Sequence, residues 1–245
     1  MKYRAINDIS VQKNDFFSFF CTKFVYLHHN DTYCQMTKNT LNQVGNTPFT
    51  TSVLASLYSE TRRINDKARR LEQEGRIVRL KRGLYVRSSD DGATLVPMLI
   101  ANHLYGPSYV SMHTALRHYG LIPERVYEIQ SMTTKHSRSF DTPIGRFSYL
   151  SCPLNYFSLG VRQEAQGTDT YLVATPEKAL CDLIVKSPRL TATCVKSLNG
   201  WLAEDLRFDM DALRHFDVEL LKQCGMQAPV KNNIITLLTN LINHE

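Results

Sequence analysis

The chain has 245 residues, a formal net charge of +6, 43% hydrophobic residues and 21% charged residues. These values are ordinary for a globular protein and allow one large domain or two modest ones with a real core. The sequence shows no internal repeat and no low-complexity segment. The six cysteines form no Cys-x-x-Cys pair, and Cys152, Cys181 and Cys194 stand in apolar surroundings. We therefore expect reduced, buried thiols in a cytoplasmic protein, without disulfide, metal site or cofactor.

The N-terminal stretch does not fit the pattern of the rest. The segment from Phe16 to Leu27 is apolar, but Lys23 interrupts it and no small-residue cleavage site follows. It is also too short to span a bilayer, so we expect no membrane association. Met36 opens a stretch typical of the start of a small DNA-binding domain. We expect Met36 to be the native start and residues 1–35 to pack poorly.

Three helices are predicted after Met36. The first covers residues 37–44 and is ended by Gly45, and the second begins at Thr50 or Thr51 and runs through Tyr58. Ser59 is the next good cap, and a third helix is predicted from there to about Glu74. The apolar positions of this third helix form a narrow inward stripe at Ile64, Ala68 and Leu71.

A hairpin is predicted directly after the third helix. Residues 76–80 and 84–86 are strand-like, and the turn Lys81-Arg82-Gly83 joins them with a glycine where a positive φ is expected. Three helices followed by a hairpin are the plan of a winged helix. In that plan the third helix lies in the DNA major groove, while the hairpin contacts the flanking backbone.

Positive charge is concentrated in this same region. From Arg62 to Arg87 the chain carries ten Lys or Arg against three acids, an excess of seven, whereas the rest of the chain sums to −1. A local basic patch beside a neutral remainder is the electrostatic pattern of a protein that binds a polyanion. Arginine can bond guanine or phosphate bidentately, and lysine attracts phosphate as a point charge. We predict DNA contacts from Thr61, Arg62, Arg63, Asn65, Asp66, Lys67, Arg69, Arg70, Arg79, Lys81 and Arg82.

The polar, turn-rich residues 88–93 form the best domain boundary. We expect an α+β protein with a non-conforming extension at 1–36, a winged helix-turn-helix domain at 37–88 and a larger mixed α/β domain at 94–245. In the last domain, helices are expected over 95–105, 111–119, 175–186, 192–204, 210–216, 218–224 and 230–243. Strands are expected there over 125–133, 144–150, 155–163 and 170–174.

Three segments resemble the antitoxins of abortive-infection toxin–antitoxin systems of type IV (the AbiEi family). The run GRIVRLKRGLYV at 75–86 resembles the wing of these proteins. The segment YVSMHTALRHYGLIP at 109–123 is similar to their Tyr, Ser, Ala-Leu and Gly-Leu-Ile-Pro motif. The segment ATPEKALCDLI at 174–184 is similar to their Thr-Pro-Glu-Lys-Ala-Leu-x-Asp helix start. The matches occur in the expected order and cover about residues 40–190.

The resemblance implies an N-terminal winged helix and a C-terminal antitoxin domain. It also implies that the protein represses its own operon by binding promoter DNA and opposes a nucleotidyltransferase-like toxin. A stable complex with the toxin is not assumed, because type IV antitoxins need not form one. Inverted repeats in the operator would imply two copies of the chain on DNA. The motif residues of the antitoxin domain are Ser111, Thr175, Glu177, Lys178 and Asp182.

A structural role is the favoured interpretation for most of these motif residues. Thr175 can cap the helix that follows it, Glu177 lies in the positive first turn, and Asp182 can bond a neighbouring loop. His113 and His118 are five residues apart on different faces of a predicted helix, which favours structural or surface roles over catalysis.

Enzyme classes are disfavoured by missing motifs. No acid precedes a Glu-x-Lys on a strand as a metal-dependent nuclease would need; Glu124 and Glu128 come nearest. There is no Gly-Ser dipeptide for a nucleotidyltransferase and no phosphate-binding loop. We therefore predict no catalytic residues. The alternative functions are a transcriptional regulator that responds to a small ligand and, less favoured, a nuclease.

Overall fold

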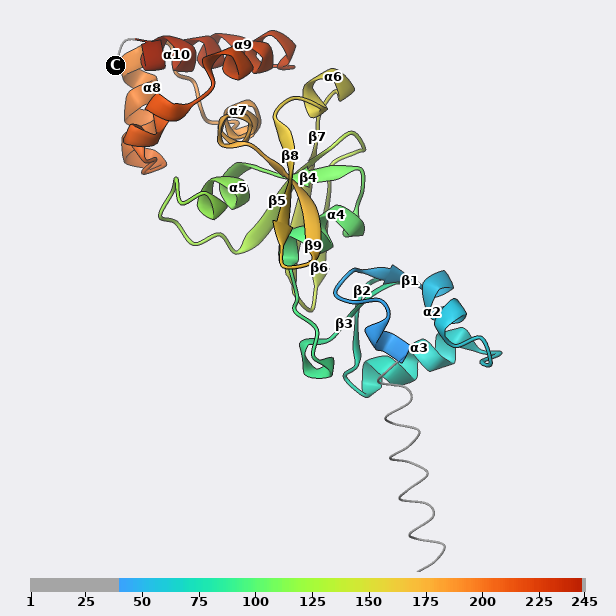
Figure 1. The fold of residues 1–245 in the computed structure, drawn as a ribbon. Coiled ribbons are helices and arrows are strands. Elements are labelled where there is room, and N and C mark those ends of the chain that lie inside the picture. The colour runs from blue at the N-terminus through green and yellow to red at the C-terminus, as the bar shows by residue number, and fades with distance from the viewer. Residues whose placement is uncertain (1–39, 244–245) are drawn as a thin grey trace, which may run out of the picture. The chain divides into compact units, whose positions relative to one another are not determined.

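A computed structural model of the chain describes residues 40–243 (Figure 1). The predicted extension, the native start at Met36 and the beginning of the helix expected over 37–44 lie outside the described residues. Residues 40–42 are helical, and Gly45 follows with a φ of +58°. From Asn46 onward the described chain belongs to one compact unit. Its structure is mixed α and β, which confirms that part of the predicted fold class.

The first part of this unit combines two helices with a three-stranded antiparallel sheet. Strand β1 (Phe49–Thr50) leads into α2 (Thr51–Leu57), and α3 (Ile64–Gln73) leads into β2 (Ile77–Lys81) and β3 (Leu84–Arg87). The sheet order is β1-β3-β2. The cap predicted at Thr50 is confirmed, since its hydroxyl oxygen accepts the backbone N–H of Val53 at 3.4 Å. Gly83 turns the hairpin with a φ of +78°, as expected.

The third predicted helix begins later than expected. Its first residue is Ile64, and Arg63, not the predicted Ser59, holds the N-cap position. A turn closed by the bond from the Thr61 N–H to the Tyr58 carbonyl, 2.9 Å, occupies the place of the predicted first helical turn. The helix therefore starts at the first residue of the apolar stripe. Thr61, Arg62 and Arg63 precede it.

The larger part of the unit is built on a six-stranded mixed sheet with the order β6-β7-β5-β4-β9-β8. The pairs β5–β7 and β4–β9 are parallel, and the other neighbours are antiparallel. The strands are β4 (Ser108–Val110), β5 (Glu128–Thr133), β6 (Arg138–Thr142), β7 (Gly145–Ser151), β8 (Val161–Gln166) and β9 (Asp169–Ala174). Among the described strands, β6 and β8 form the two edges.

Helices lie beside this sheet, and the last ones of the chain gather at one end of it (Figure 1). A short 3-10 turn (Ser89–Asp91) and α4 (Pro97–Leu104) follow the hairpin, and α5 (Met112–His118) follows β4. Helix α4 contacts β4, β5 and β9, whereas α7 contacts α5, β9 and α9. The remaining helical segments are α6 (Leu154–Phe157), α7 (Pro176–Lys186), α8 (Val195–Gly200), a π-helical turn (Trp201–Asp205), a 3-10 turn (Met210–His215), α9 (Val218–Gln227) and α10 (Asn232–Asn243).

Several predicted elements of this region were wrong. The strand expected over 155–163 is split into α6 and the start of β8, because Gly160 reverses the chain with a φ of +57°. Strands β4 and β6 were not predicted. The helix expected over 192–204 begins at Val195 and passes into a π-helical turn. Cys194, expected in apolar surroundings, is exposed, whereas Cys152, Cys181 and Cys224 are buried free thiols.

One contiguous core runs through most of the unit. It includes Leu80, Leu84 and Val86 of the hairpin and continues through α4, the large sheet and α7 to Leu241 of α10. The polar segment 88–93, predicted as a domain boundary, therefore lies within a region where the two sides share buried apolar contacts. The division into domains at this segment stays a prediction.

Candidate nucleic-acid interface and buried motif cluster

Helix α3 presents a polar face opposite its buried residues. Ala68 and Leu71 are fully buried, while Asn65, Asp66, Arg69 and Arg70 are exposed. Lys67 is half-buried with its ammonium 4.6 Å from the centre of the Tyr58 ring. Burial, and then the charge of Arg70, lowers the pKa of Lys67. Before the helix, Arg62 and Arg63 are exposed and Thr61 is half-buried.

Two arginines counted in the basic patch are buried. Arg76 Nε lies 3.0 Å from one carboxylate oxygen of Asp91, and Arg87 Nε lies 3.2 Å from the other. All three side chains are less than a tenth exposed. Arg87 also donates to the Asp91 backbone carbonyl at 2.6 Å. These two charges are therefore taken up inside the fold, and the exposed part of the patch is smaller than the sequence count.

Exposed ion pairs partly neutralise two further arginines. Arg70 Nε lies 2.7 Å from Glu74, and an Arg79 nitrogen lies 2.8 Å from Glu72. Such solvent-exposed pairs contribute about 0–1 kcal/mol each, so both arginines can exchange partners readily. Arg79 is also positioned over the Tyr85 ring, at 5.7 Å from its centre.

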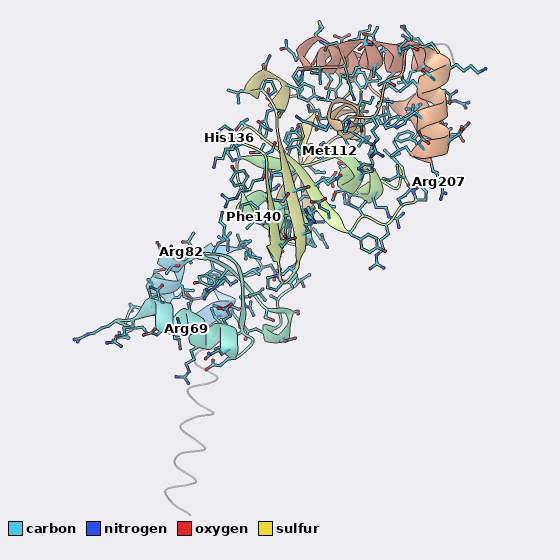
Figure 2. The ribbon with its side chains drawn as sticks, turned by 180° about the vertical axis from the view of Figure 1, so that it is seen from behind. Arg69, Arg82, Met112, His136, Phe140 and Arg207 are labelled. Carbon is cyan, nitrogen blue, oxygen red and sulfur yellow. The ribbon has the colours of Figure 1, made fainter. Side chains whose placement is uncertain are left out.

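The two basic residues of the hairpin turn, Lys81 and Arg82, have different surroundings. Lys81 donates through Nζ to the Leu104 carbonyl at the end of α4 and lies 5.6 Å from the centre of the Phe140 ring. Burial, followed by the charges of Arg138 and Lys135, lowers the pKa of Lys81. Arg82, at the tip of the hairpin, is exposed (Figure 2). Within residues 40–243, Arg62, Arg63, Arg69 and Arg82 form no ion pair, which leaves them available to phosphate.

The motif residues Ser111, Lys178 and Asp182 meet in one buried cluster. Asp182 Oδ2 accepts the hydroxyl of Ser111 at 2.6 Å and that of Tyr109 at 3.0 Å. Ser111 and Asp182 have no exposed surface. The Asp182 carboxylate thus joins α7 to Tyr109 in β4 and to Ser111, the residue that connects β4 to α5. Burial and the charge of Asp182 raise the pKa of Tyr109.

Lys178 completes this cluster from one turn earlier in α7. Its Nζ lies 2.9 Å from Asp182 Oδ1, donates to the Tyr156 carbonyl at 3.0 Å and lies over the Tyr156 ring. Gly160 packs so closely that a Cβ there would lie 2.7 Å from Lys178 Cβ. Both charged side chains are fully buried, so each charge depends on the opposite charge of the other to offset its loss of contact with water.

The other motif residues hold the start of α7. Thr175 accepts the Lys178 N–H at 3.4 Å, as its predicted capping role requires. Glu177 accepts the N–H of Asp217 at 3.2 Å and so links α7 to the start of α9. Tyr156, which closes the cluster, was not singled out from sequence, since nothing local marks it as a partner of Lys178.

The two histidines have separate surroundings, as predicted. His113 Nδ1 lies 3.1 Å from Gln130 Oε1, and His118 Nε2 lies 2.7 Å from Glu164. The nuclease candidate Glu128 forms an ion pair with Arg146 at 3.3 Å. Nowhere in residues 40–243 do three or more His, Cys, Asp or Glu side chains gather as a metal site would require.

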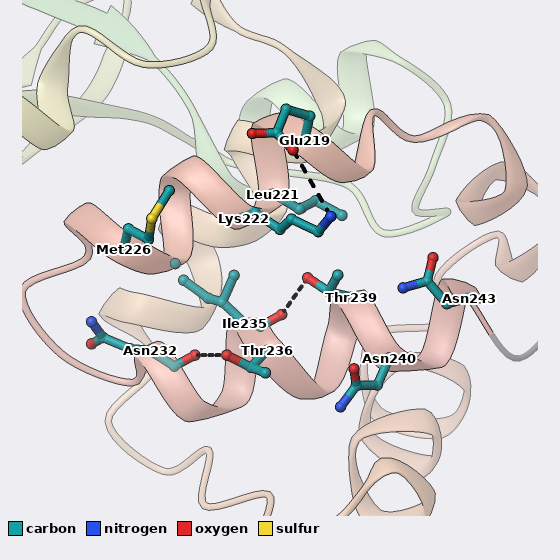
Figure 3. Close-up of a pocket in the computed structure, with 11 residues that line it drawn as sticks. Glu219, Leu221, Lys222, Met226, Asn232, Ile235, Thr236, Thr239, Asn240 and Asn243 are labelled. Carbon is teal, nitrogen blue, oxygen red and sulfur yellow. Dashed lines mark hydrogen bonds and ion pairs between the residues drawn. The ribbon is translucent and has the colours of Figure 1, made fainter.

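A groove of about 570 Å³ lies between α9 and α10 (Figure 3). Its polar groups largely serve the helices themselves. Thr236 donates to the Asn232 carbonyl at 3.0 Å, Thr239 donates to the Ile235 carbonyl at 3.1 Å, and Lys222 lies 3.9 Å from Glu219. None of the residues predicted to be functional lines this groove.

Comparison with known protein families finds no family model that matches the chain, and no curated protein matches it. Among the described residues, no helix combines the length and the apolar character needed to cross a membrane.

Proposed function

We propose that the protein is a DNA-binding transcriptional regulator whose region at about 37–88 is a winged helix-turn-helix domain. The observation that carries this proposal is one contiguous element order. Helices α2 and α3 are followed by the β2–β3 hairpin, and exposed arginines lie on α3, before it and at the hairpin tip. This is the arrangement in which a helix reads the major groove and a wing contacts the backbone.

The proposed contacts divide by the chemistry of each side chain. Asn65 and Asp66, in the first turn of α3, are suited to base edges, which donate and accept hydrogen bonds in the major groove. Arg62 and Arg69 can bond guanine or phosphate, and Arg82 is suited to phosphate or the minor groove. We also propose DNA contacts from Thr61, Arg63, Lys67, Arg70, Arg79 and Lys81.

We further propose that the regulator is a cytoplasmic antitoxin of a type IV toxin–antitoxin system. It would repress its own operon and oppose a nucleotidyltransferase-like toxin without a stable complex. The support is the resemblance of the segments at 75–86, 109–123 and 174–184 to the AbiEi family. It is strengthened by the bonding of the second and third segments to each other through Ser111 and Asp182. We propose no catalytic activity and no cofactor.

DNA binding is tested by titrating a duplex from the protein's own promoter at several salt concentrations. Arg69→Ala and Arg82→Ala should each weaken binding to all duplexes and reduce the slope of log K against log salt by about one. Asn65→Ala should instead change which sequences are preferred. Arg146→Ala, which removes an exposed arginine from β7, is the charge-matched control. If Arg69→Ala and Arg82→Ala bind with the wild-type affinity and slope, the proposed interface is wrong.

The antitoxin proposal is tested by identifying the neighbouring gene and expressing its product with and without this chain. A nucleotidyltransferase-like product whose growth arrest is relieved by this chain would support it. A neighbour of another class, with no growth arrest to relieve, would contradict it. The alternative of a ligand-responsive regulator has one specific observation in its favour, a cavity in the C-terminal part of the chain that is lined by His113, Arg189, Trp201 and Asp205.

A further inference from the structure

A cavity of about 670 Å³ lies where the start of α5, the segment after α7 and the π-helical turn meet. This volume is within the range of small-molecule sites, about 300–1,000 Å³. The side chains that give the cavity its chemistry are His113, Arg189, Trp201 and Asp205, and Leu190 and Leu206 add buried apolar surface. None of these residues takes part in the proposed DNA interface.

Two irregular backbone segments border this cavity. Met112, directly before His113, is buried with a φ of +53°, a conformation that costs a residue with a side chain about 1–3 kcal/mol (Figure 2). Bonds on both sides hold it, from the Ser111 hydroxyl to Asp182 and from the His113 N–H to Gln130 Oε1 at 3.2 Å. Trp201 and Asp205 belong to the π-helical turn, a rare form that is frequent at functional sites.

The hydrogen bonds of His113 define which ring nitrogen is free. Gln130 Oε1 accepts the backbone N–H of His113, so this atom is an oxygen that can only accept. The ring Nδ1, 3.1 Å from the same oxygen, must therefore carry the proton. In the neutral imidazole the lone pair then lies on Nε2, for which no hydrogen-bond partner is found within residues 40–243, so this form of His113 can accept a hydrogen bond from a ligand.

The other lining residues complement different parts of a ligand. Arg189 and Asp205 are exposed, and neither forms an ion pair within residues 40–243. A guanidinium binds phosphate or carboxylate bidentately, and the face of a half-buried Trp201 is suited to stacking on a planar ring. The Asp205 carboxylate and His113 Nε2 are two acceptors, which fit the amine and hydroxyl donors of a nucleoside.

We infer that this cavity binds a small planar ligand with an anionic group, of the class of a ribonucleoside monophosphate. Arg189 binds the phosphate, Trp201 stacks on the base, and His113 and Asp205 accept hydrogen bonds from the base amine or the ribose hydroxyls. This inference goes beyond the proposed function and does not depend on DNA binding.

The test uses the full-length protein, in which Trp201 is the single tryptophan, so tryptophan emission reports on the surroundings of this one residue. Ribonucleoside monophosphates, the corresponding nucleosides and inorganic phosphate are each titrated. At least one monophosphate should change the emission saturably and raise the melting temperature. Its nucleoside and inorganic phosphate should each bind more weakly, because each lacks half of the contacts.

Variants assign the binding to the cavity. Arg189→Gln should raise the Kd of the monophosphate about tenfold or more, the loss expected for a charge-assisted hydrogen bond. Arg214→Gln, the same change at an exposed arginine outside the cavity, should leave the Kd unchanged. The inference is overturned if no monophosphate gives a saturable change, if the nucleoside binds as tightly as its monophosphate, or if Arg189→Gln binds like the wild type.

Discussion

Lys178 and Asp182 lie one turn apart on α7, and neither side chain has any exposed surface. Water therefore cannot compensate either charge, and the pair depends on Ser111, Tyr109 and the Tyr156 carbonyl for its remaining hydrogen bonds. Such a cluster specifies one arrangement of α7 against β4, because any other arrangement leaves a charge buried alone. At the scale of single residues, the motif residues Ser111, Lys178 and Asp182 thus have a structural role, which is to fix α7 against β4.

Asp182→Ala should lower the free energy of unfolding by about 3–5 kcal/mol, because it leaves the Lys178 ammonium buried without its counter-charge. Urea unfolding measures this loss. A double variant, Lys178→Met with Asp182→Leu, should recover most of it, since no buried charge remains. Arg146→Ala breaks only the exposed pair with Glu128 and should cost less than about 1 kcal/mol. A loss from Asp182→Ala no larger than this control would contradict the role given to the pair.

At the scale of elements, the sequence predicted best what local chemistry determines. The caps at Thr50 and Thr175 and the turn at Gly83 lie where expected, because each depends on residues within a few positions. Strand β4 has only three residues and β6 reads RSFDT, so neither shows a clear apolar period. The start of α3 was misplaced because Ser59 is a good cap by type, while the fold closes a turn there instead.

The candidate sites were also predicted best where they depend on residues close together in the sequence. The exposed arginines could be found from charge alone, whereas the burial of Arg76 and Arg87 could not, because Asp91 lies outside the basic run. The meeting of Ser111 with Asp182 spans 71 positions. The resemblance named both residues, but only the sheet order, which brings β4 beside β9 and α7, explains their contact.

The hairpin gives a test of what the contact of Lys81 with the end of α4 contributes to stability. Lys81→Met should lower the free energy of unfolding by about 1–3 kcal/mol, because it removes a charged donor from the Leu104 carbonyl at the negative end of α4. Arg82→Met should leave stability within about 0.5 kcal/mol of the wild type, since the side chain is exposed. Thermal and urea unfolding of both variants provide the comparison. Equal effects at the two positions would show that the Lys81 contact contributes nothing.

At the scale of the whole molecule, the continuous core has a consequence for unfolding. Leu80, Leu84 and Val86 share one apolar cluster with the large sheet, so the hairpin should not open independently of it. Hydrogen exchange at increasing urea concentrations measures the opening free energies of β3 and β5 separately. We expect the two to converge on one global value. A lower value for β3 would instead indicate that the segment 88–93 separates two independently stable domains.

Asp91 places a limit on how this chain can vary in length. Its carboxylate and backbone carbonyl bind arginines from both ends of the hairpin, Arg76 before β2 and Arg87 at the end of β3. A residue inserted between Arg87 and Asp91 would pull the carboxylate out of register and leave two guanidinium groups buried without a counter-ion. Insertions after Gly92 would not disturb these bonds. Length variation among relatives of this protein should therefore begin after Asp91, and the polar composition of 88–91 should not be taken as that of an exchangeable linker.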